Sequence, residues 1–316
     1  METDRGARRK RTIFKRKFLS CICSLIIFLF FLTGSLLCAQ QVLRLQAASG
    51  AAVELSARSL QPGEVILAVA HGTSDSRAAE LTFVGKDYVF AANGPAGLPF
   101  ALLGIDLDTI PGSYRVTAVF KSEAGQKEIV EQYVRVRAKS FARANIVLKD
   151  LSLITPPPEA APRIAQEQEL LTRVFGQSSG EWLGQGNFVL PNPGRISPNF
   201  GEKRFYNGLP RSPHTGVDIS AALGEPVLAS NAGRVVLARD LYFAGYSVIL
   251  DHGLGVFTFY CHFSKLEVQE GQNVQRGDLI GLVGSTGRAT GPHLHWSLRV
   301  RDARVDPLSL VSLALE

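Results

Sequence analysis

The chain has 316 residues, 46% of them hydrophobic, which is enough for two domains of ordinary size with substantial cores. Its formal net charge of +6 would by itself suggest nucleic-acid binding. However, residues 1–17 hold eight of the 34 basic and two of the 28 acidic residues, so the rest of the chain carries 26 of each sign. This distribution excludes nucleic acid as an expected partner.

An uncharged apolar run of 21 residues, 18–38, directly follows this basic tail. A helix needs roughly 20 such residues to cross the hydrocarbon core of a bilayer. The run is either an uncleaved anchor or a long signal peptide ending near Ala39, and its length favours the anchor. Basic residues before it keep the N-terminus in the cytoplasm. We therefore expect a single-pass protein of the cytoplasmic membrane with its later domains outside, in the periplasm, or a secreted protein if the segment is cleaved.

Residues 41–148 show short alternating runs separated by turn residues. Around seven strands are expected, among them 53–55, 64–69, 80–84, 114–120 and 129–136, with turns at 61–63, 93–95 and 111–113. This pattern predicts an immunoglobulin-like β-sandwich domain. Three of the four cysteines lie within 18–38. Cys261 therefore has no disulfide partner in the exported part, and we expect it to be a small buried residue.

Residues 149–187 change in character and are interpreted as a linker. The Pro156-Pro157-Pro158 run is a stiff break, and residues 163–175 have the periodicity of one amphipathic helix. From 188 to 316 the β pattern returns with more glycine, which predicts a second β domain.

Two stretches of this second domain have possible functional meanings. Residues 251–255 are predicted to form a hairpin turn, with His252 as a turn residue rather than a ligand. The glycine-rich stretch 284–291 superficially resembles a phosphate-binding loop. It lacks the GK[ST] ending and precedes a strand, so nucleotide binding is excluded. Its glycines more plausibly let the loop approach a nearby pair of histidines.

That pair is His293 and His295, two of only six histidines in the chain. Positions i and i+2 of a strand share a face, so both imidazoles should project together while Leu294 enters the core. His214 and Asp218 lie four residues apart and are likewise predicted to share one face of a strand. Such a mixed nitrogen and oxygen set suits Zn²⁺. The alternatives are that Asp218 caps a turn, or that histidines such as His262 are packed strand residues.

Several motifs of the second domain occur in a specific order. They are the residues 194–201 with Asn199-Phe200-Gly201, His214-Thr215-Gly216-Val217-Asp218, Val248 to Gly253, His262 within 260–264, Gly284 to Arg288, and Gly291-Pro292-His293-Leu294-His295. In this order and spacing, residues 188–310 resemble the catalytic domain of the lysostaphin-type, LytM-like zinc metallo-endopeptidases. The resemblance implies an antiparallel β-sheet domain with the duplicated hybrid motif fold.

The resemblance also implies the roles of individual residues. His214, Asp218 and His295 would be ligands of one Zn²⁺ per chain, and a water would take the remaining position. His262 and His293 would be catalytic, one as the general base that takes a proton from this water and the other stabilising the developing oxyanion. Which of the two plays which part stays open.

The expected function is therefore zinc-dependent hydrolysis of peptide bonds in peptidoglycan, outside the cytoplasmic membrane. The alternative is a non-catalytic LytM-like module that binds the cell wall or activates other wall hydrolases. Loss of metal ligands would mark such a module, and no ligand is lost here. The sequence leaves open which peptidoglycan bond is cut, what the sandwich-like domain does, and the oligomeric state.

Overall fold

The computed structural model describes residues 41–73, 79–92, 94–122, 125–148 and 151–316. The basic tail and the apolar segment 18–38 lie outside these described residues. Among the helices that are described, none combines the length and the apolar character needed to cross a membrane.

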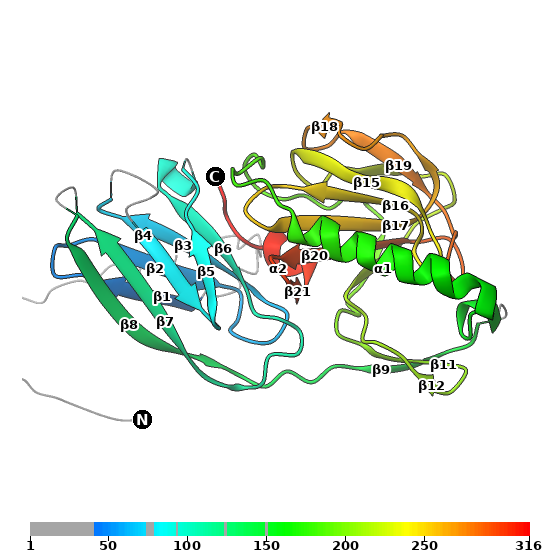
Figure 1. Cartoon of the computed structure of the whole chain (residues 1–316), viewed down its shortest axis with the longest axis horizontal. Helices are drawn as coiled ribbons and strands as arrows, with labels where there is room; N and C mark the ends of the chain where they lie inside the picture. The colour runs from blue at the N-terminus through cyan, green and yellow to red at the C-terminus, as the bar shows by residue number, and fades with distance from the viewer. Residues whose placement is uncertain (1–40, 74–78, 93, 123–124, 149–150) are drawn as a thin grey trace, which may run out of the picture. The chain divides into compact units, whose positions relative to one another are not determined.

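Two four-stranded antiparallel sheets are built from residues 41–136 (Figure 1). The first has the order β1-β2-β3-β6, with β1 (Gln41–Gln46), β2 (Ala52–Ala57), β3 (Val65–His71) and β6 (Phe100–Gly104). The second has the order β5-β4-β7-β8, with β5 (Lys86–Val89), β4 (Ala79–Phe83), β7 (Gly112–Lys121) and β8 (Lys127–Val136). A short 3₁₀ helix, η2 (Pro95–Gly97), precedes β6.

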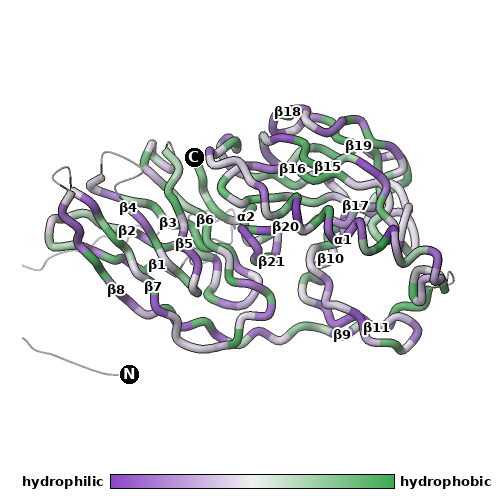
Figure 2. The backbone as a smooth tube through the Cα atoms, viewed as in Figure 1, coloured by the Kyte–Doolittle hydropathy of each residue, from purple (hydrophilic) through white to green (hydrophobic). Residues whose placement is uncertain are grey.

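One hydrophobic cluster fills the space between these sheets. Leu55 of the first sheet and Leu81 and Val116 of the second belong to it. The alternation along the strands explains this packing, because β7 buries Val116, Ala118 and Phe120 while the residues between them are only partly buried. Strand β6 is apolar and buried along its whole length, whereas β8 is mostly exposed and more hydrophilic (Figure 2).

The linker contains one long helix, and one additional strand lies just before the linker. Helix α1 (Ala161–Gly176) confirms the predicted helix and follows the short 3₁₀ helices η3 (Leu151–Leu153) and η4 (Pro158–Ala160). Its residues Leu170, Leu171, Val174 and Phe175 pack on the apolar face of the C-terminal sheet. Before it, β9 (Arg143–Ile146) pairs in parallel with β11 (Lys203–Tyr206), and β12 (Leu209–Pro210) completes a three-stranded sheet.

The C-terminal part contains a ten-stranded sheet in which the paired strands are antiparallel. Its main path is β10-β13-β20-β17-β16-β15-β18, and β14, β19 and β21 attach beside it. The bounds are β10 (Arg195–Ser197), β13 (Gly216–Ser220), β14 (Pro226–Leu228), β15 (Gly233–Leu241), β16 (Gly245–Asp251), β17 (Val256–Leu266), β18 (Asn273–Val274), β19 (Leu279–Val283), β20 (Leu294–Val300) and β21 (Ala303–Val305). A short helix, α2 (Pro307–Val311), ends the domain.

The register of this sheet determines which side chains meet. Asp218 of β13 is paired with His295 of β20, and His295 is paired on its other side with Cys261 of β17. Residues far apart in the sequence therefore become direct neighbours. The expectation of a mainly β chain is correct.

His252 lies in the predicted turn, and its side chain has an environment that the sequence did not reveal. The turn at 251–255 does join β16 to β17, but the His252 side chain is fully buried. Its Nδ1 lies 2.7 Å from the Ala232 carbonyl oxygen and its Nε2 lies 2.7 Å from the Thr258 hydroxyl. Both ring nitrogens are therefore occupied by the protein, and burial lowers the pKa of His252 to about 4.

Acid is expected to destabilise the fold through His252. Its folded pKa of about 4 lies below the ordinary 6.5, so the unfolded chain takes up a proton first. The contribution of neutral His252 to the free energy of unfolding is complete above the ordinary pKa. It is lost as the pH falls towards the pKa of the folded state, and the total loss is about 3 kcal/mol. The free energy of unfolding in urea is compared at neutral pH and at a pH near the folded pKa of His252. Between these two conditions it should fall by ~2 kcal/mol less in a His252→Asn variant than in the wild type. Equal losses would contradict this role.

Candidate metal centre

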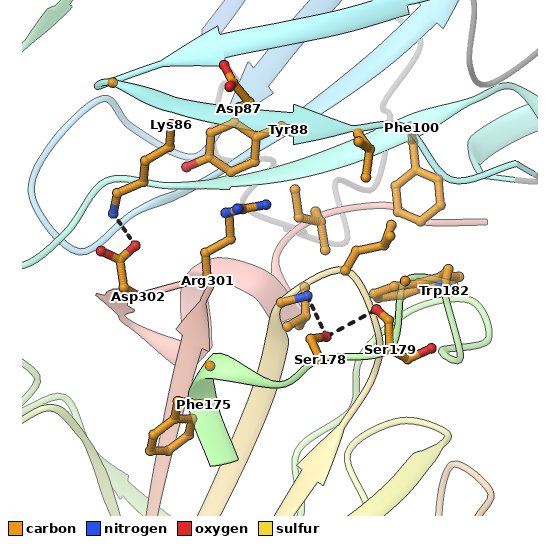
Figure 3. Close-up of a pocket in the computed structure, with 18 residues that line it drawn as sticks. Lys86, Asp87, Tyr88, Phe100, Phe175, Ser178, Ser179, Trp182, Arg301 and Asp302 are labelled. Atoms are coloured by element: carbon orange, nitrogen blue, oxygen red, sulfur yellow. Dashed lines mark hydrogen bonds and ion pairs between the residues drawn. The ribbon is translucent and has the colours of Figure 1, made fainter. Parts of the chain in front are cut away.

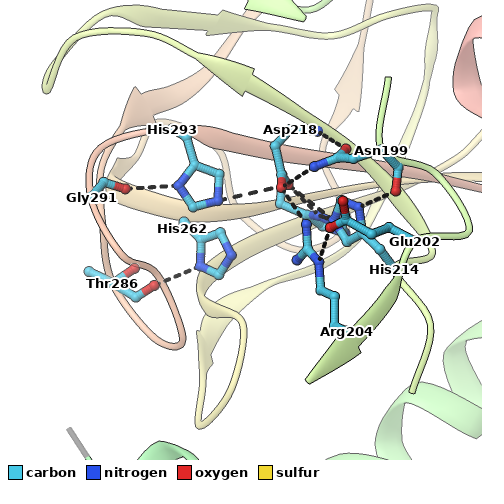
Figure 4. A network of polar contacts seen from close by, with 10 residues as sticks. Asn199, Glu202, Arg204, His214, Asp218, His262, Thr286, Gly291 and His293 are labelled. Carbon is cyan, nitrogen blue, oxygen red and sulfur yellow. Dashed lines mark hydrogen bonds and ion pairs between the residues drawn. The ribbon is translucent and has the colours of Figure 1, made fainter. Parts of the chain in front are cut away.

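Candidate ligand atoms of His214, Asp218 and His295 lie within 4.8 Å of one another, and Figure 4 shows His214 and Asp218 in this network of polar contacts. The Nε2 atom of His214 lies 2.8 Å from the Nδ1 atom of His295 and 3.1 Å from the Oδ1 atom of Asp218. The same Oδ1 atom lies 3.1 Å from His295 Nδ1. The structure therefore brings together the three residues that the resemblance named as ligands.

The chemistry of this cluster calls for a cation. The His214 Nδ1 atom lies 3.1 Å from the carbonyl oxygen of Asn199, to which it can only donate a proton. Neutral His214 therefore turns the lone pair of Nε2 towards the Asp218 carboxylate. Burial lowers the pKa of His214 to about 4, so a second proton on this ring is disfavoured at neutral pH. A metal ion would balance the converging lone pairs, and two imidazoles with one carboxylate suit Zn²⁺.

The elements that hold the three side chains differ in kind. Asp218 and His295 lie within β13 and β20 respectively. His214 was predicted to share the strand of Asp218, but β13 begins only at Gly216. The main chain of His214 is held instead by Gly201 N–H, which donates to its carbonyl at 2.7 Å, and by its own N–H, which donates to the Glu202 carbonyl at 2.9 Å.

Gly216 has a steric reason for standing between His214 and Asp218. A Cβ atom there would lie 2.4 Å from the Trp296 carbonyl oxygen and 2.9 Å from Cε1 of the His295 ring. Any side chain would therefore push β13 away from β20. The glycine allows the two ligand-bearing strands to pair closely beside the metal centre.

Asp218 is held by two residues whose role the sequence did not reveal. Asn199 Nδ2 donates to Asp218 Oδ2 at 2.9 Å, and Arg204 Nη2 donates to the same oxygen at 2.7 Å. Burial would lower the pKa of Arg204, but the charge of Asp218 raises it overall. These contacts leave Oδ1 of Asp218 free to face the two histidines. Asn199 also stands in a motif of the family resemblance, whereas no local signal marks Arg204, which reaches Asp218 only through the fold.

Replacing Arg204 with glutamine is expected to weaken Zn²⁺ binding about 10- to 100-fold, the usual effect of removing a residue that orients a metal ligand. Asp218 would lose its charged partner and the constraint on its carboxylate. Competition against a chromogenic chelator measures the affinity, with Arg239→Gln as a matched control because Arg239 pairs with Glu270 elsewhere. An unchanged affinity in Arg204→Gln would show that Asn199 alone orients the carboxylate.

His262 and His293 lie beside this cluster with their rings 4.8 Å apart between centroids. Each is oriented through Nδ1, which lies 2.7 Å from the Thr286 carbonyl oxygen in His262 and 2.8 Å from the Gly291 carbonyl oxygen in His293. Because Nδ1 faces a carbonyl in both rings, the lone pair of the neutral imidazole is on Nε2 in each. The Nε2 atom of His293 lies 3.8 Å from Asp218 Oδ1. Burial and then the neighbouring His293 lower the pKa of His262 to about 3, which keeps it neutral.

A β-bulge directs the His262 side chain. Two residues of β17, Cys261 and His262, occupy the space opposite Ser247, and His262 has a positive φ of 67°. Here β17 also changes partner, from β20 to β19. Cys261 is buried, and burial raises the pKa of its thiol, which fits the expectation of a buried residue that is not a ligand.

The glycine-rich loop 284–291 passes close to the histidines, as predicted. Its Thr286 and Gly291 carbonyls are the acceptors for His262 and His293. A Cβ atom on Gly284 would lie 2.2 Å from the Ser264 main-chain nitrogen. The glycine therefore lets the loop lie directly against β17, where it fixes both rings.

A separate cavity contains none of these residues. It is lined by β5 residues together with Phe100, Trp182 and Arg301 (Figure 3). The Lys86–Asp302 ion pair closes one side of it. The converging histidines and Asp218, rather than this cavity, are therefore the candidate catalytic centre.

Comparisons with known proteins agree with the geometry. The model of Peptidase family M23 matches residues 212–307, a range that contains all five site residues. Peptidoglycan DD-endopeptidase ShyA of Vibrio cholerae is 45% identical over 115 residues, which cover 36% of this chain and 27% of ShyA. DD-carboxypeptidase/endopeptidase Mpg of Neisseria meningitidis is 44% identical over 97 residues, which cover 31% of this chain and 22% of Mpg. The chain thus spans less than a third of the length of these curated relatives.

A solved structure extends the likeness beyond the C-terminal domain. The crystal structure of a Pseudomonas aeruginosa protein assigned to peptidase M23 matches with a TM-score of 0.62 and 31% identity. The match covers 80% of this chain and 96% of that one. Taken with the family model, this shows that the chain belongs to peptidase family M23, which confirms the family and the enzyme class predicted from its motifs.

Proposed function

We propose that the protein is a zinc-dependent endopeptidase that hydrolyses peptide bonds of peptidoglycan. The observation that carries this proposal is the convergence of one carboxylate oxygen and two imidazole nitrogens, all within 3.1 Å of one another. The substrate class is supported by the names of ShyA and Mpg, which describe peptidoglycan DD-endopeptidase and DD-carboxypeptidase/endopeptidase activities.

His214, Asp218 and His295 are the proposed ligands of one Zn²⁺ per chain. When bound, the ion would supply Lewis-acid chemistry, polarising the scissile carbonyl and making a water more acidic. Asn199 and Arg204 would keep the carboxylate ionised and oriented, since both donate to its Oδ2 atom. The carbonyl of Asn199 would fix the tautomer of His214.

His262 and His293 are the proposed catalytic residues. Their Nδ1 protons are committed to main-chain carbonyls, so each ring offers Nε2 to the reaction. A neutral imidazole can take a proton from the attacking water and later give it to the leaving amine. The second imidazole, once protonated, can stabilise negative charge on the carbonyl oxygen. The two rings lie close together, and either could be the general base while the other stabilises the oxyanion. We therefore assign the two roles to the pair and not to individual residues.

The surroundings of the catalytic part are also proposals. Residues 18–38 would anchor the chain in the cytoplasmic membrane, or direct its secretion if cleaved, after a cytoplasmic tail at 1–17. Residues 41–148 would form an immunoglobulin-like domain, and 149–187 would link it to the peptidase domain at 188–316. In this arrangement the catalytic domain works outside the membrane, where peptidoglycan lies.

The test combines metal analysis with digestion of purified peptidoglycan. The proposal requires about one Zn²⁺ per chain and the release of soluble fragments whose masses show hydrolysed peptide bonds. Chelation should abolish the release of these fragments, and adding Zn²⁺ should restore it. Bound zinc without cleavage would favour the non-catalytic module that binds the wall or activates other hydrolases. Mass analysis of fragments from defined cross-linked muropeptides would identify the bond.

A further inference from the structure

Arg288 occupies a fixed place in the loop that orients the two proposed catalytic histidines. Its N–H donates to the Phe243 carbonyl at 2.8 Å, and it lies two residues after Thr286, the acceptor for His262. The preceding Gly287 has a φ of 69°, and a Cβ atom there would lie 2.4 Å from the Gly245 nitrogen. The backbone of Arg288 is therefore locked against the segment that begins β16.

The guanidinium of Arg288 is held by aromatic rings. Its Cζ atom lies 4.0 Å from the centroid of the Phe243 ring and 5.2 Å from that of Tyr206. Such contacts orient a planar guanidinium while leaving its edge free for hydrogen bonds. Across the described parts of the chain, no carboxylate forms an ion pair with Arg288, and its buried Nε atom has no hydrogen-bond partner.

Three other half-buried arginines are neutralised by carboxylates, whereas Arg299, like Arg288, lies over an aromatic ring, that of Phe175. Arg58 pairs with Glu64 and Asp306, Arg204 pairs with Asp218, and Arg304 pairs with Asp106. Burial lowers the pKa of Arg288, an effect that Tyr206 opposes, although a guanidinium remains charged at any working pH. Arg288 therefore carries a positive charge that no carboxylate of the described residues balances.

The residues that frame Arg288 are neighbours in the chain of residues that support the candidate site. Tyr206 stands on β11 two positions from Arg204, the partner of Asp218, and alternate residues of a strand share a face. Phe243 precedes Ala244, whose carbonyl accepts the His262 N–H at 3.0 Å. The two rings that hold the guanidinium therefore belong to the segments that also carry Arg204 and the acceptor of the His262 N–H.

We propose that Arg288 binds a carboxylate of the substrate peptide and so selects substrates with a free carboxyl group near the scissile bond. This inference rests on the proposed peptidoglycan peptidase function. Stem peptides carry free carboxylates at chain ends and on acidic residues, and the planar guanidinium matches a carboxylate in a two-pronged hydrogen bond. The substrate would supply the negative charge that the described part of the chain does not.

The experiment compares two cross-linked muropeptides, one with free carboxyl groups and one in which these are carboxamides. The wild type should prefer the free acid by about 10- to 100-fold in kcat/KM, as expected for one hydrogen-bonded charge pair. Arg288→Gln should raise KM for the free acid by a similar factor, with kcat, bound zinc and the amide reaction nearly unchanged. Arg288→Lys should recover only part of the preference.

Arg276→Gln is the matched control, because Arg276 contacts Asn187 and Glu316 away from the metal centre. Equal losses on both substrates in Arg288→Gln, or a wild type that does not discriminate, would overturn the inference while leaving the proposed function intact. A zinc-loaded wild type that cleaves neither substrate would contradict the proposed function itself and the inference with it.

Discussion

Replacing His295 with alanine should remove bound zinc and peptidoglycan hydrolysis together. The substitution leaves His214 and Asp218 as a two-ligand site, and a catalytic zinc ordinarily needs three protein ligands. Removing a residue that only orients a metal ligand lowers the metal affinity by ~100-fold at most. We expect the loss of Zn²⁺ affinity in His295→Ala to be well above this value. Metal content after desalting and the rate of fragment release measure the two effects on one preparation.

His71→Ala is the control for this substitution, since His71 ends β3 and belongs to another sheet. The control should keep its zinc and its activity. A His295→Ala protein that folds, retains a stoichiometric zinc ion and still cleaves would end the assignment of this cluster as the metal centre. Circular dichroism separates loss of the ion from loss of the fold.

Substitution of His293 by alanine should also abolish hydrolysis, but the variant should retain its zinc. Its Nε2 atom is 3.8 Å from Asp218 Oδ1, beyond the tight triangle of the three ligand atoms. We expect kcat to fall by about 10²- to 10⁴-fold, the usual contribution of a positioned general acid or base. His262→Ala should behave likewise, because its ring is held in the same way from the same loop.

Metal analysis and steady-state kinetics on the same samples decide this prediction. Loss of zinc from His293→Ala but not from His295→Ala would reverse the assignment of ligand and catalytic residue. Comparing the pH profiles of the two single variants would show which imidazole must be unprotonated in the free enzyme. That residue is the base, and the other stabilises the oxyanion.

The sequence predicted most of the site because its signals are local. The pairing of His293 and His295 around buried Leu294 follows from the alternation of a strand, and Leu294 is fully buried. The helix at 163–175 followed from its periodicity, and α1 spans it. The glycines of 284–291 predicted a close approach because a residue without a side chain permits one.

The missed features depend on contacts between distant segments. Arg204 reaches Asp218 because β11 folds back towards β13, which no spacing in the sequence encodes. His252 was assigned to a turn, and its burial, which the sequence did not reveal, places its ring against Ala232, just before β15, and Thr258 of β17. The parallel pairing of β9 with β11 joins segments on opposite sides of the linker. Each of these needs the register of the sheets, which the amino-acid pattern alone leaves undetermined.

The two histidine ligands present different ring atoms, Nε2 from His214 and Nδ1 from His295. The Nδ1 atom is nearer to its own main chain, so β20 would lie closer to a bound ion than the segment bearing His214. An asparagine amide reaches about as far as Nδ1 and a glutamine amide about as far as Nε2. The isosteric replacements would therefore not be interchangeable, with asparagine suited to His295 and glutamine suited to His214.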